Sequence, residues 1–232
     1  MTIKAVLFDF SGTLFRIEPT ESWLRAVLTE AGVALSEPKL TLAAEALERA
    51  GAQAGGALPA EAPAGELGDL WAVRDHSAER HRAAYTGLSR QVRLPDPALH
   101  DALYDRHMAP RAWSPYPDAA EVLAGLRERG VAVGVVSNIG WDLRPVFRVH
   151  DLDPYVGAYV LSYEHSLQKP DRRLFALACE ALGVDARDTL MVGDDRRADG
   201  GAAALGCGVH FVDHLPVDRR PDGLRPVLDL IG

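Results

Sequence analysis

The feature that most constrains the fold of this chain is a short apolar run that recurs along the sequence and ends each time at glycine or polar residues. The first run, at residues 5–8, is closed by Asp9. Four similar runs occur late in the chain, at residues 131–136, 158–161, 190–192 and 209–212. Continuous apolar runs of this kind are typical of strands that are buried on both faces of a parallel sheet.

Helical patterns alternate with the late runs. Apolar residues recur at helical spacing in residues 118–129, 172–182 and 197–205, and a glycine follows each stretch at the point where a helix would end. Alternating strands and helices predict an α/β fold, in which a Rossmann-like, doubly wound parallel sheet forms the core.

The segment after the first strand has a different pattern. Residues 16–109 contain no convincing strand, but they carry apolar stripes at helical spacing near residues 23–28, 40–47, 67–88 and 97–108. Residues 51–65 are rich in alanine, glycine and proline, which is typical of a loop. We therefore expect a helical cap domain at 16–109, inserted into a core made of residues 1–15 and 110–232.

Composition narrows the class of function. Hydrophobic residues make up 47% of the 232 residues and the net charge is −8, which is ordinary for a soluble globular chain and disfavours a nucleic-acid or anionic-membrane partner. Cys179 and Cys207 lie in apolar stretches, which favours buried free thiols and a reducing compartment. We expect a cytoplasmic monomer or homodimer that acts on a small molecule, without a nucleic-acid or membrane partner.

Polar groups follow the predicted strands at their carboxyl ends, where parallel α/β sheets bind ligands. They are Asp9, the pair Ser137-Asn138, Lys169, and the acids Asp194 and Asp199. Carboxylates gathered at one edge repel one another unless a cation lies among them, and oxygen ligands suit Mg²⁺. Lys169 can hold an anion or neutralise Asp9, and Ser137 can donate to phosphoryl oxygens. Together they indicate a Mg²⁺ site and a small phosphorylated substrate.

These stretches resemble the haloacid dehalogenase-like hydrolase superfamily. The matching motifs are VLFDFSGTLF (6–15), VVSN (135–138), KPD (169–171) and VGDDRRADGGAAALG (192–206), in the order and spacing of that family. The resemblance covers the predicted core, whereas residues 16–109 match only as a helical cap placed after the first motif. The four motifs together are specific for the superfamily and say little about the substrate.

The resemblance implies a hydrolase in which Asp9 is the nucleophile and forms a covalent aspartyl intermediate. It assigns Mg²⁺ to Asp9, the backbone carbonyl of Ser11 and Asp194, with Asp199 reaching the ion through water. Ser137 and Lys169 resemble the pair that orients the phosphate and balances its charge, so with Asp9 they form the expected catalytic set.

The same resemblance places five residues at the substrate, namely Gly12, Thr13, Ser137, Asn138 and Lys169. Gly12 would also permit the tight turn after the first strand, and Thr13 would brace that turn by hydrogen bonding.

Ser11 departs from the pattern of the family's phosphatases, which carry a second aspartate two residues after the nucleophile to protonate the leaving group. A serine hydroxyl cannot do acid–base work near neutral pH, and this catalysis is worth roughly 10²–10⁴-fold in rate. Three interpretations remain open: a phosphatase that manages without this acid, a relative of the 2-haloacid dehalogenases or phosphonatases, and an inactive binding module that keeps the fold. The phosphonatase interpretation needs a cap lysine, and Lys39 is the only lysine there.

Other residues of interest carry weaker signals. The predicted cap contains four histidines without metal-binding spacing, which we expect to be solvated on its surface: His76, His81, His100 and His107. Trp141 follows the second motif and is the best tryptophan candidate for lining the pocket, and the nearby Arg144 could meet an anionic substrate.

Overall fold

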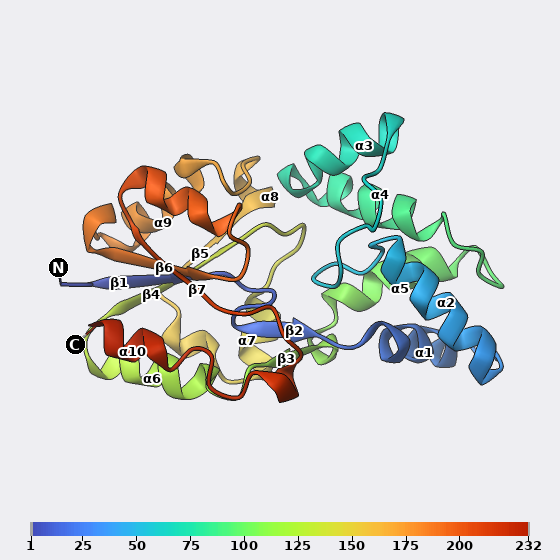
Figure 1. The fold of residues 1–232 in the computed structure, drawn as a ribbon, viewed down its shortest axis with the longest axis horizontal. Helices are drawn as coiled ribbons and strands as arrows, with labels where there is room; N and C mark the ends of the chain where they lie inside the picture. The colour runs from blue at the N-terminus through green and yellow to red at the C-terminus, as the bar shows by residue number, and fades with distance from the viewer. Residues whose placement is uncertain (1, 232) are drawn as a thin grey trace.

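The centre of the molecule is a five-stranded parallel sheet in the order β5-β4-β1-β6-β7 (Figure 1). The computed structural model describes residues 2–231, so Met1 and Gly232, which the sequence analysis assigned to the core, lie outside the described residues. The strands are β1 (Ala5–Phe8), β4 (Ala132–Ser137), β5 (Ala158–Leu161), β6 (Thr189–Gly193) and β7 (Gly208–Phe211). These are the five apolar runs of the sequence, so the predicted parallel sheet is confirmed.

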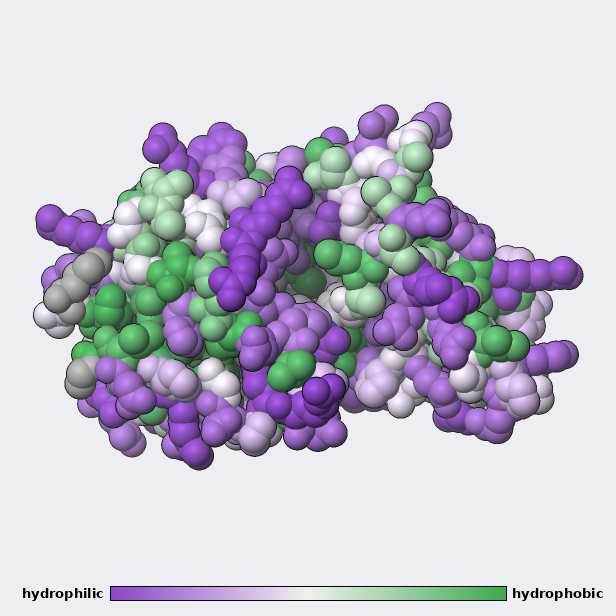
Figure 2. All heavy atoms as spheres, in the orientation of Figure 1, coloured by the Kyte–Doolittle hydropathy of each residue, from purple (hydrophilic) through white to green (hydrophobic). Residues whose placement is uncertain are grey.

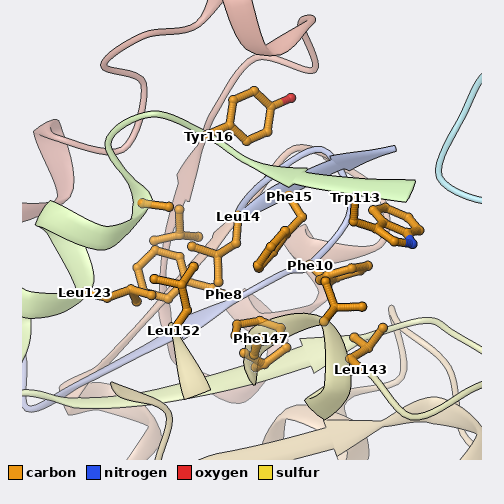
Figure 3. Packing of buried hydrophobic residues seen from close by; sticks show 14 of the residues in the cluster. Phe8, Phe10, Leu14, Phe15, Trp113, Tyr116, Leu123, Leu143, Phe147 and Leu152 are labelled. Carbon is orange, nitrogen blue, oxygen red and sulfur yellow. The ribbon is translucent and has the colours of Figure 1, made fainter. Parts of the chain in front are cut away.

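Helices cover both faces of the sheet, which explains why its strands are mostly apolar. Val6 and Phe8 of β1 join one hydrophobic cluster, whereas Leu7 between them joins another on the opposite face. The first face is covered by α6 (Ala119–Glu128), α7 (Arg144–Val149) and α10 (Pro226–Ile231). The second face is covered by α9 (Arg172–Leu182). Figure 3 shows Phe8 packed with Leu123 and Phe147 on the first face. The Rossmann-like α/β prediction is therefore confirmed.

One predicted helix of the core has a different form. The segment expected as a helix at 197–205 is a 3₁₀ helix, Asp199–Leu205. Two adjacent glycines, Gly200 and Gly201, weaken an α-helix here because glycine disfavours helix interiors. A Cβ at Gly201 would also strike Pro170, so the close approach of these two segments requires a glycine.

Along the chain, five α-helices come after β1 and before α6. In space these helices lie together on one side of the molecule (Figure 1). They are α1 (Thr20–Glu30), α2 (Glu37–Arg49), α3 (Gly65–Ala72), α4 (Ala78–Ser89) and α5 (Leu99–Met108). They bury a hydrophobic cluster of their own, with Trp23, Leu47 and Leu103 among its members. We refer to residues 18–112 as the helical insert.

A two-stranded antiparallel ribbon joins the two ends of the helical insert. Its strands are β2 (Phe15–Ile17) and β3 (Trp113–Pro115). The expectation that residues 16–109 contain no strand is therefore wrong at Arg16 and Ile17. A strand of three residues is too short to produce an alternating pattern in the sequence. The ribbon places the chain entering the helical insert beside the chain leaving it.

Two further expectations concern membranes and cysteines. Among the helices of residues 2–231, none has the length and apolar character needed to cross a membrane. Cys179 and Cys207 are buried and free, as the sequence predicts.

Three histidines of the helical insert are buried, contrary to the prediction that they are solvated. His81, His100 and His107 are 1%, 7% and 0% exposed. Each has a polar partner in the insert: the backbone N–H of Ala54 donates to His107 Nε2 at 3.1 Å, His81 Nδ1 lies 2.9 Å from the Tyr104 hydroxyl, and His100 Nδ1 lies 2.7 Å from Ser89 Oγ. Burial lowers the pKa of His107 to about 3 and also lowers that of His81, because the imidazolium loses its hydration.

The buried His107 predicts a loss of stability in mild acid. Its pKa is about 3 when folded and about 6.5 when unfolded, so the unfolded chain binds the proton more readily. The contribution is complete above pH 6.5 and is lost as the pH falls toward 3. Between pH 7 and pH 5, His107 should remove about 2 kcal/mol from the free energy of unfolding. Urea unfolding at both pH values should show this loss in the wild type and a smaller loss in His107→Gln.

The control variant is His165→Gln, because His165 is exposed on α8 (Ser162–His165). It should keep the pH dependence of the wild type. An unchanged pH dependence in His107→Gln would show that the His107 imidazole binds a proton as readily in the folded protein as in the unfolded chain.

Candidate active site

A cleft of about 500 Å³ opens where the carboxyl edge of the sheet faces the helical insert. The space-filling view shows this face hollowed between the two parts of the molecule, with hydrophilic residues on its left and hydrophobic residues at its right edge (Figure 2). The sheet side supplies six of the residues singled out in the sequence, namely Asp9, Ser11, Ser137, Asn138, Lys169 and Asp194. The helical insert supplies Trp71, Arg74 and Tyr85 together with the loop at residues 53–58.

Lys169 is the central cation of the site. Its Nζ donates to Asp9 Oδ1 at 2.7 Å and to Asp199 Oδ1 at 2.6 Å, and its side chain is only 2% exposed. Although burial disfavours an ammonium ion, the carboxylates of Asp199 and Asp9 raise the pKa of Lys169, so it stays charged. Lys169 therefore holds two carboxylates that come from different segments of the chain.

Asp9 follows β1 and Asp194 follows β6, and these two strands pair in parallel with Phe8 opposite Val192. One oxygen from each of Asp9, Asp194 and Asp199 lies within 4.8 Å of the other two. Burial raises the pKa of Asp9; Lys169 opposes this effect, and the neighbouring Asp199 and Asp194 add to it. Lys169 contacts only two of these three carboxylates, Asp9 and Asp199, so the cluster holds more acids than this lysine pairs.

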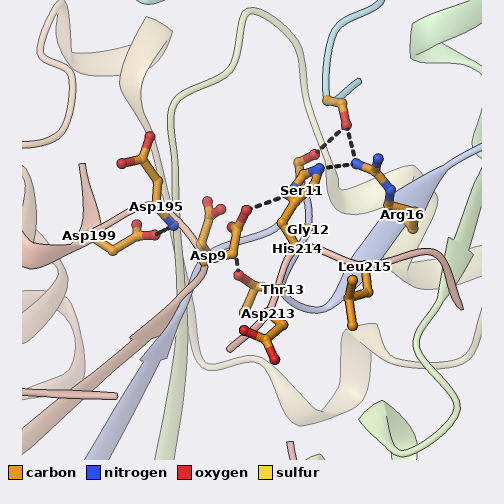
Figure 4. Close-up of polar contacts among 12 residues, drawn as sticks. Asp9, Ser11, Gly12, Thr13, Arg16, Asp195, Asp199, Asp213, His214 and Leu215 are labelled. Carbon is orange, nitrogen blue, oxygen red and sulfur yellow. Dashed lines mark hydrogen bonds and ion pairs between the residues drawn. The ribbon is translucent and has the colours of Figure 1, made fainter. Parts of the chain in front are cut away.

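These carboxylates fit a divalent cation that prefers oxygen ligands, such as Mg²⁺. Asp9 and Asp194 open onto the cleft. Asp199 is fully buried, and its second oxygen accepts a hydrogen bond from the backbone N–H of Asp195 at 3.0 Å. Asp9 and Asp194 are therefore the residues with room to hold the ion, and Asp199 lies behind them. Figure 4 shows Asp9 between the glycine turn and Asp199.

The Asp194 carboxylate contacts two side chains, of which only one belongs to a sequence motif. Thr13 Oγ1 donates to its Oδ1 at 3.1 Å, and His214 Nδ1 contacts its Oδ2 (Figure 4). Burial opposes ionisation, but the hydrogen bond and charge of His214 hold the pKa of Asp194 below its usual range. On its other side, the His214 ring contacts the Arg16 guanidinium. A cation at Asp194 would lie beside His214.

The turn at Gly12 and Thr13 lies beneath the cleft and does not form part of its lining. Gly12 has a φ of +79°, and a Cβ there would strike both His214 and Asp194, so only glycine fits. The Arg220 guanidinium donates to the backbone carbonyls of Gly12 and Thr13. The Thr13 hydroxyl faces Asp194 and the two backbone carbonyls face Arg220, so the turn supports the site, and the substrate contact expected for these two residues stays a prediction.

Asn138 fixes the backbone of Lys169. Its Oδ1 accepts from the Lys169 N–H at 2.7 Å, and its Nδ2 donates to the Lys169 carbonyl at 3.1 Å. Ser137 stands at the end of β4, is 2% exposed and faces the cleft. The second and third motifs therefore contact each other directly at the floor of the site.

Ser11 contacts the helical insert. Its hydroxyl donates to the Gly55 carbonyl at 3.4 Å, and Arg16 Nη1 donates to the same oxygen at 2.7 Å (Figure 4). Gly55 has a φ of +77°, and a Cβ on it would lie 2.6 Å from both Ser11 Oγ and the Trp113 ring. The loop that carries Gly55 can approach the core this closely only without a side chain.

Several residues singled out in the sequence lie outside the cleft lining. Trp141 is buried in the main hydrophobic cluster, packed against the rings of His81 and Trp113. Arg144 lies on α7 and pairs with Asp142 and Glu164. Lys39 is exposed on α2.

In their place the cleft contains Trp71, Arg74, Tyr85 and His214. No motif marks these four residues. Trp71, Arg74 and Tyr85 come from the helical insert and His214 from the loop after β7, and only the folded chain brings them to the sheet edge.

Comparisons with known proteins agree with this architecture. The chain is 31% identical over 144 residues to (S)-2-haloacid dehalogenase 4A of Burkholderia cepacia, covering 61% of this chain and 58% of the relative. It is 38% identical over 117 residues to phosphoserine phosphatase of Thermus thermophilus, covering 50% and 44%. The matched region thus spans about half the length of these curated relatives.

Among solved structures, the magnesium-bound putative HAD-hydrolase YfnB of Bacillus subtilis superposes with a TM-score of 0.68 at 17% identity, covering 100% of this chain and 99% of that one. This likeness shows that the two chains share a fold. The family model described as haloacid dehalogenase-like hydrolase matches residues 3–206. The chain therefore belongs to the haloacid dehalogenase-like hydrolase family, as its four motifs predict.

Proposed function

We propose that this protein is a Mg²⁺-dependent phosphatase that acts on a small phosphorylated molecule through a covalent intermediate on Asp9. The observation that carries the proposal is the environment of the Asp9 carboxylate. Lys169 holds Oδ1, which leaves Oδ2 as the oxygen available for attack, and the carboxylate lines the cleft beside Asp194.

In the first step, Asp9 Oδ2 forms a bond to phosphorus while the bond from phosphorus to the leaving oxygen breaks. In the second step, a water oxygen bonds to the same phosphorus while the bond from Asp9 Oδ2 to phosphorus breaks. This step restores the carboxylate and releases inorganic phosphate, which keeps the protons of the water. Lys169 balances the charge of Asp9, and the Ser137 hydroxyl is placed to donate to a phosphoryl oxygen.

Asp9, Asp194 and the carbonyl of Ser11 would hold Mg²⁺, with Asp199 behind them. When bound, the ion supplies positive charge that offsets the charge on the phosphoryl group. The clustered carboxylates of the site support this assignment, because a divalent ion would relieve their repulsion.

We propose that residues 16–109 act as a cap over a core of residues 1–15 and 110–232. Hydrogen bonds at the cleft join the helical insert to the core. The Gly55 carbonyl accepts from the Ser11 hydroxyl, and Gln168 Nε2 donates to the Ala72 carbonyl at 2.9 Å. A cap in this position would exclude water from the reacting groups and select the substrate.

Ser11 limits the leaving groups that such an enzyme can handle. The hydroxyl cannot replace a carboxylic acid, and this loss costs most when the leaving oxygen needs a proton. We therefore expect aryl and acyl phosphates to react faster than alkyl phosphates.

A 2-haloacid dehalogenase is the second candidate. A halide leaves carbon without a proton, so Ser11 would not hinder it, and one matching relative is a dehalogenase by name. The carboxylates of Asp9 and Asp194 lie close enough to share a cation, which favours the metal-dependent reaction instead. Neither remaining alternative gains support. Lys39, the lysine that a phosphonatase would need, lies on the exposed surface of α2 and does not line the cleft. The acids and the lysine that an inactive module would be free to lose are gathered at the cleft.

Asp9→Asn should lower turnover of p-nitrophenyl phosphate with Mg²⁺ by at least about 10³-fold, because the amide is not a nucleophile. The release of p-nitrophenol measures this directly, and p-nitrophenol departs with little acid assistance. Asp229→Asn, which changes an exposed residue of α10, is the matched control and should keep full activity.

A wild type that releases halide from 2-haloacids without metal and leaves p-nitrophenyl phosphate intact would establish the dehalogenase instead. A wild type inert in both assays would favour the binding module.

Saturating Mg²⁺ should raise the melting temperature by about 5–10 °C, because binding at 100 times Kd adds about 2.7 kcal/mol to the folded state. Differential scanning fluorimetry with and without Mg²⁺, after treatment with a chelator, measures the shift. Asp194→Asn should lose most of it, whereas Asp229→Asn should retain it. A full shift in Asp194→Asn would place the ion elsewhere.

Ser11→Asp should raise kcat for an alkyl phosphate about 10-fold or more, because it supplies the missing acid. The new carboxyl would lie near the Gly55 carbonyl, which already accepts from Arg16. Ser11→Asn has a similar size and no acid, so it should give no gain. Equal rates for the two variants would show that proton donation does not limit this enzyme.

A further inference from the structure

The cleft continues well beyond the carboxylates that would meet a phosphoryl group. A second hollow of about 560 Å³ adjoins the first and shares seven residues with it, including Trp71, Arg74 and Lys169. It extends toward Gln168 and Arg197. A phosphoryl group alone would leave most of this space open, so the shape indicates a substrate with a second recognised group.

Arg74 is the cation that stands where the two hollows meet. It begins the 3₁₀ helix η1 (Arg74–His76) of the helical insert, and its side chain is 20% exposed. Its guanidinium lies on the Trp71 ring, with Cζ 3.9 Å from the ring centroid. Nη1 donates to the Trp71 carbonyl at 2.8 Å. Trp71 thus holds the guanidinium plane in one orientation.

The protein leaves much of the hydrogen-bonding capacity of Arg74 unused. A guanidinium has five N–H donors, and the hydrogen bond above is joined by a long ion pair, 3.5 Å from Nη2 to Asp75 Oδ2, and by the neighbouring Tyr85 side chain. Nε is buried and has no partner among the described residues. A largely buried guanidinium whose donors are only partly satisfied favours a further acceptor.

The other arginines near the site do not match this environment. Arg196 and Arg197 line the cleft but are exposed, so solvent screens their charge. Arg16 is committed to Gly55 and His214, and Arg220 to the Gly12 turn. Arg74 is therefore the cation best placed to recognise a ligand.

We propose that Arg74 binds a carboxylate of the substrate whose phosphoryl group lies at Asp9, so that the enzyme acts on small phosphorylated carboxylic acids. This inference rests on the proposed phosphatase function for the phosphoryl end.

The surroundings of Arg74 favour a carboxylate over a second phosphate. Trp71 covers one face of the guanidinium, so a ligand meets the edge of the plane, where two parallel N–H groups match the two oxygens of a carboxylate. Asp75 lies beside Arg74, and Asp195 also lines the cleft. Both would repel a dianionic phosphate more strongly than a singly charged carboxylate.

Phosphonates that cannot be hydrolysed test the proposal independently of turnover. Isothermal titration calorimetry with Mg²⁺ present would compare methyl-, ethyl- and propylphosphonate with phosphonoacetate, 3-phosphonopropionate and 4-phosphonobutyrate. The wild type should bind the best carboxylate-bearing ligand about 10–100-fold more tightly than the alkylphosphonate of matching length. The preferred length would report the distance from the phosphoryl site to Arg74.

Three variants test whether Arg74 causes this preference for a carboxylate. Arg74→Met should bring the ratio of the two affinities close to one, and Arg74→Lys, which keeps the charge but loses the planar fork, should give an intermediate ratio. Arg80→Met removes an exposed arginine from α4 and should keep the wild-type ratio. Melting temperatures of all three variants show that each is folded in the titration.

The outcomes separate this inference from the proposed function. A wild type that hydrolyses p-nitrophenyl phosphate but shows no preference for the carboxylate, or an Arg74→Met variant that keeps the preference, overturns the role of Arg74 alone. A wild type that binds no phosphonate and hydrolyses no phosphate ester overturns both.

Discussion

The interaction on which the site depends is the buried ammonium of Lys169 between Asp9 and Asp199. An unpaired charge at this depth would cost several kcal/mol, so the lysine and the two carboxylates stabilise one another only while all three are in place. Two features of the core fix this geometry. Asn138 holds the backbone of Lys169, and the parallel pairing of β1 with β6 brings Asp9 to the acids of the fourth motif.

The same crowding explains the glycines at this edge of the sheet. The Asp199 carboxylate rests against Gly193, where any Cβ would overlap it, and Asp194 with His214 rests against Gly12. Both glycines allow a carboxylate to approach the backbone more closely than a side chain would permit. Gly193 at the end of β6 is therefore required by the packing of the acid cluster.

The sequence predicts the sheet and the acid cluster because each leaves a local signal. Strands such as β1 and β6 are buried on both faces and read as continuous apolar runs, and the acids follow directly at their carboxyl ends. The ribbon of β2 and β3 leaves no such signal, since three residues cannot show an alternation.

Residue type was a poor guide within the helical insert. His81 and His107 are polar, yet both are buried among aromatic side chains. Each has a hydrogen-bond partner there. Arg74 and His214 reach the cleft from segments distant from any motif, so their positions follow from tertiary packing alone. Arg144 is close in sequence to the second motif and could have met an anionic substrate, but in the folded chain it pairs with Asp142 and Glu164.

Ser11 contacts the helical insert from the core. The position that would carry an acid in the family's phosphatases instead contacts the Gly55 carbonyl, which also accepts from Arg16. Arg16 contacts His214, and His214 contacts Asp194. A continuous series of polar contacts thus runs from the loop of the helical insert to an acid that we assign to the cation. Since an aspartate at position 11 would place one acceptor against another at Gly55, the serine favours a close fit between insert and core over acid catalysis.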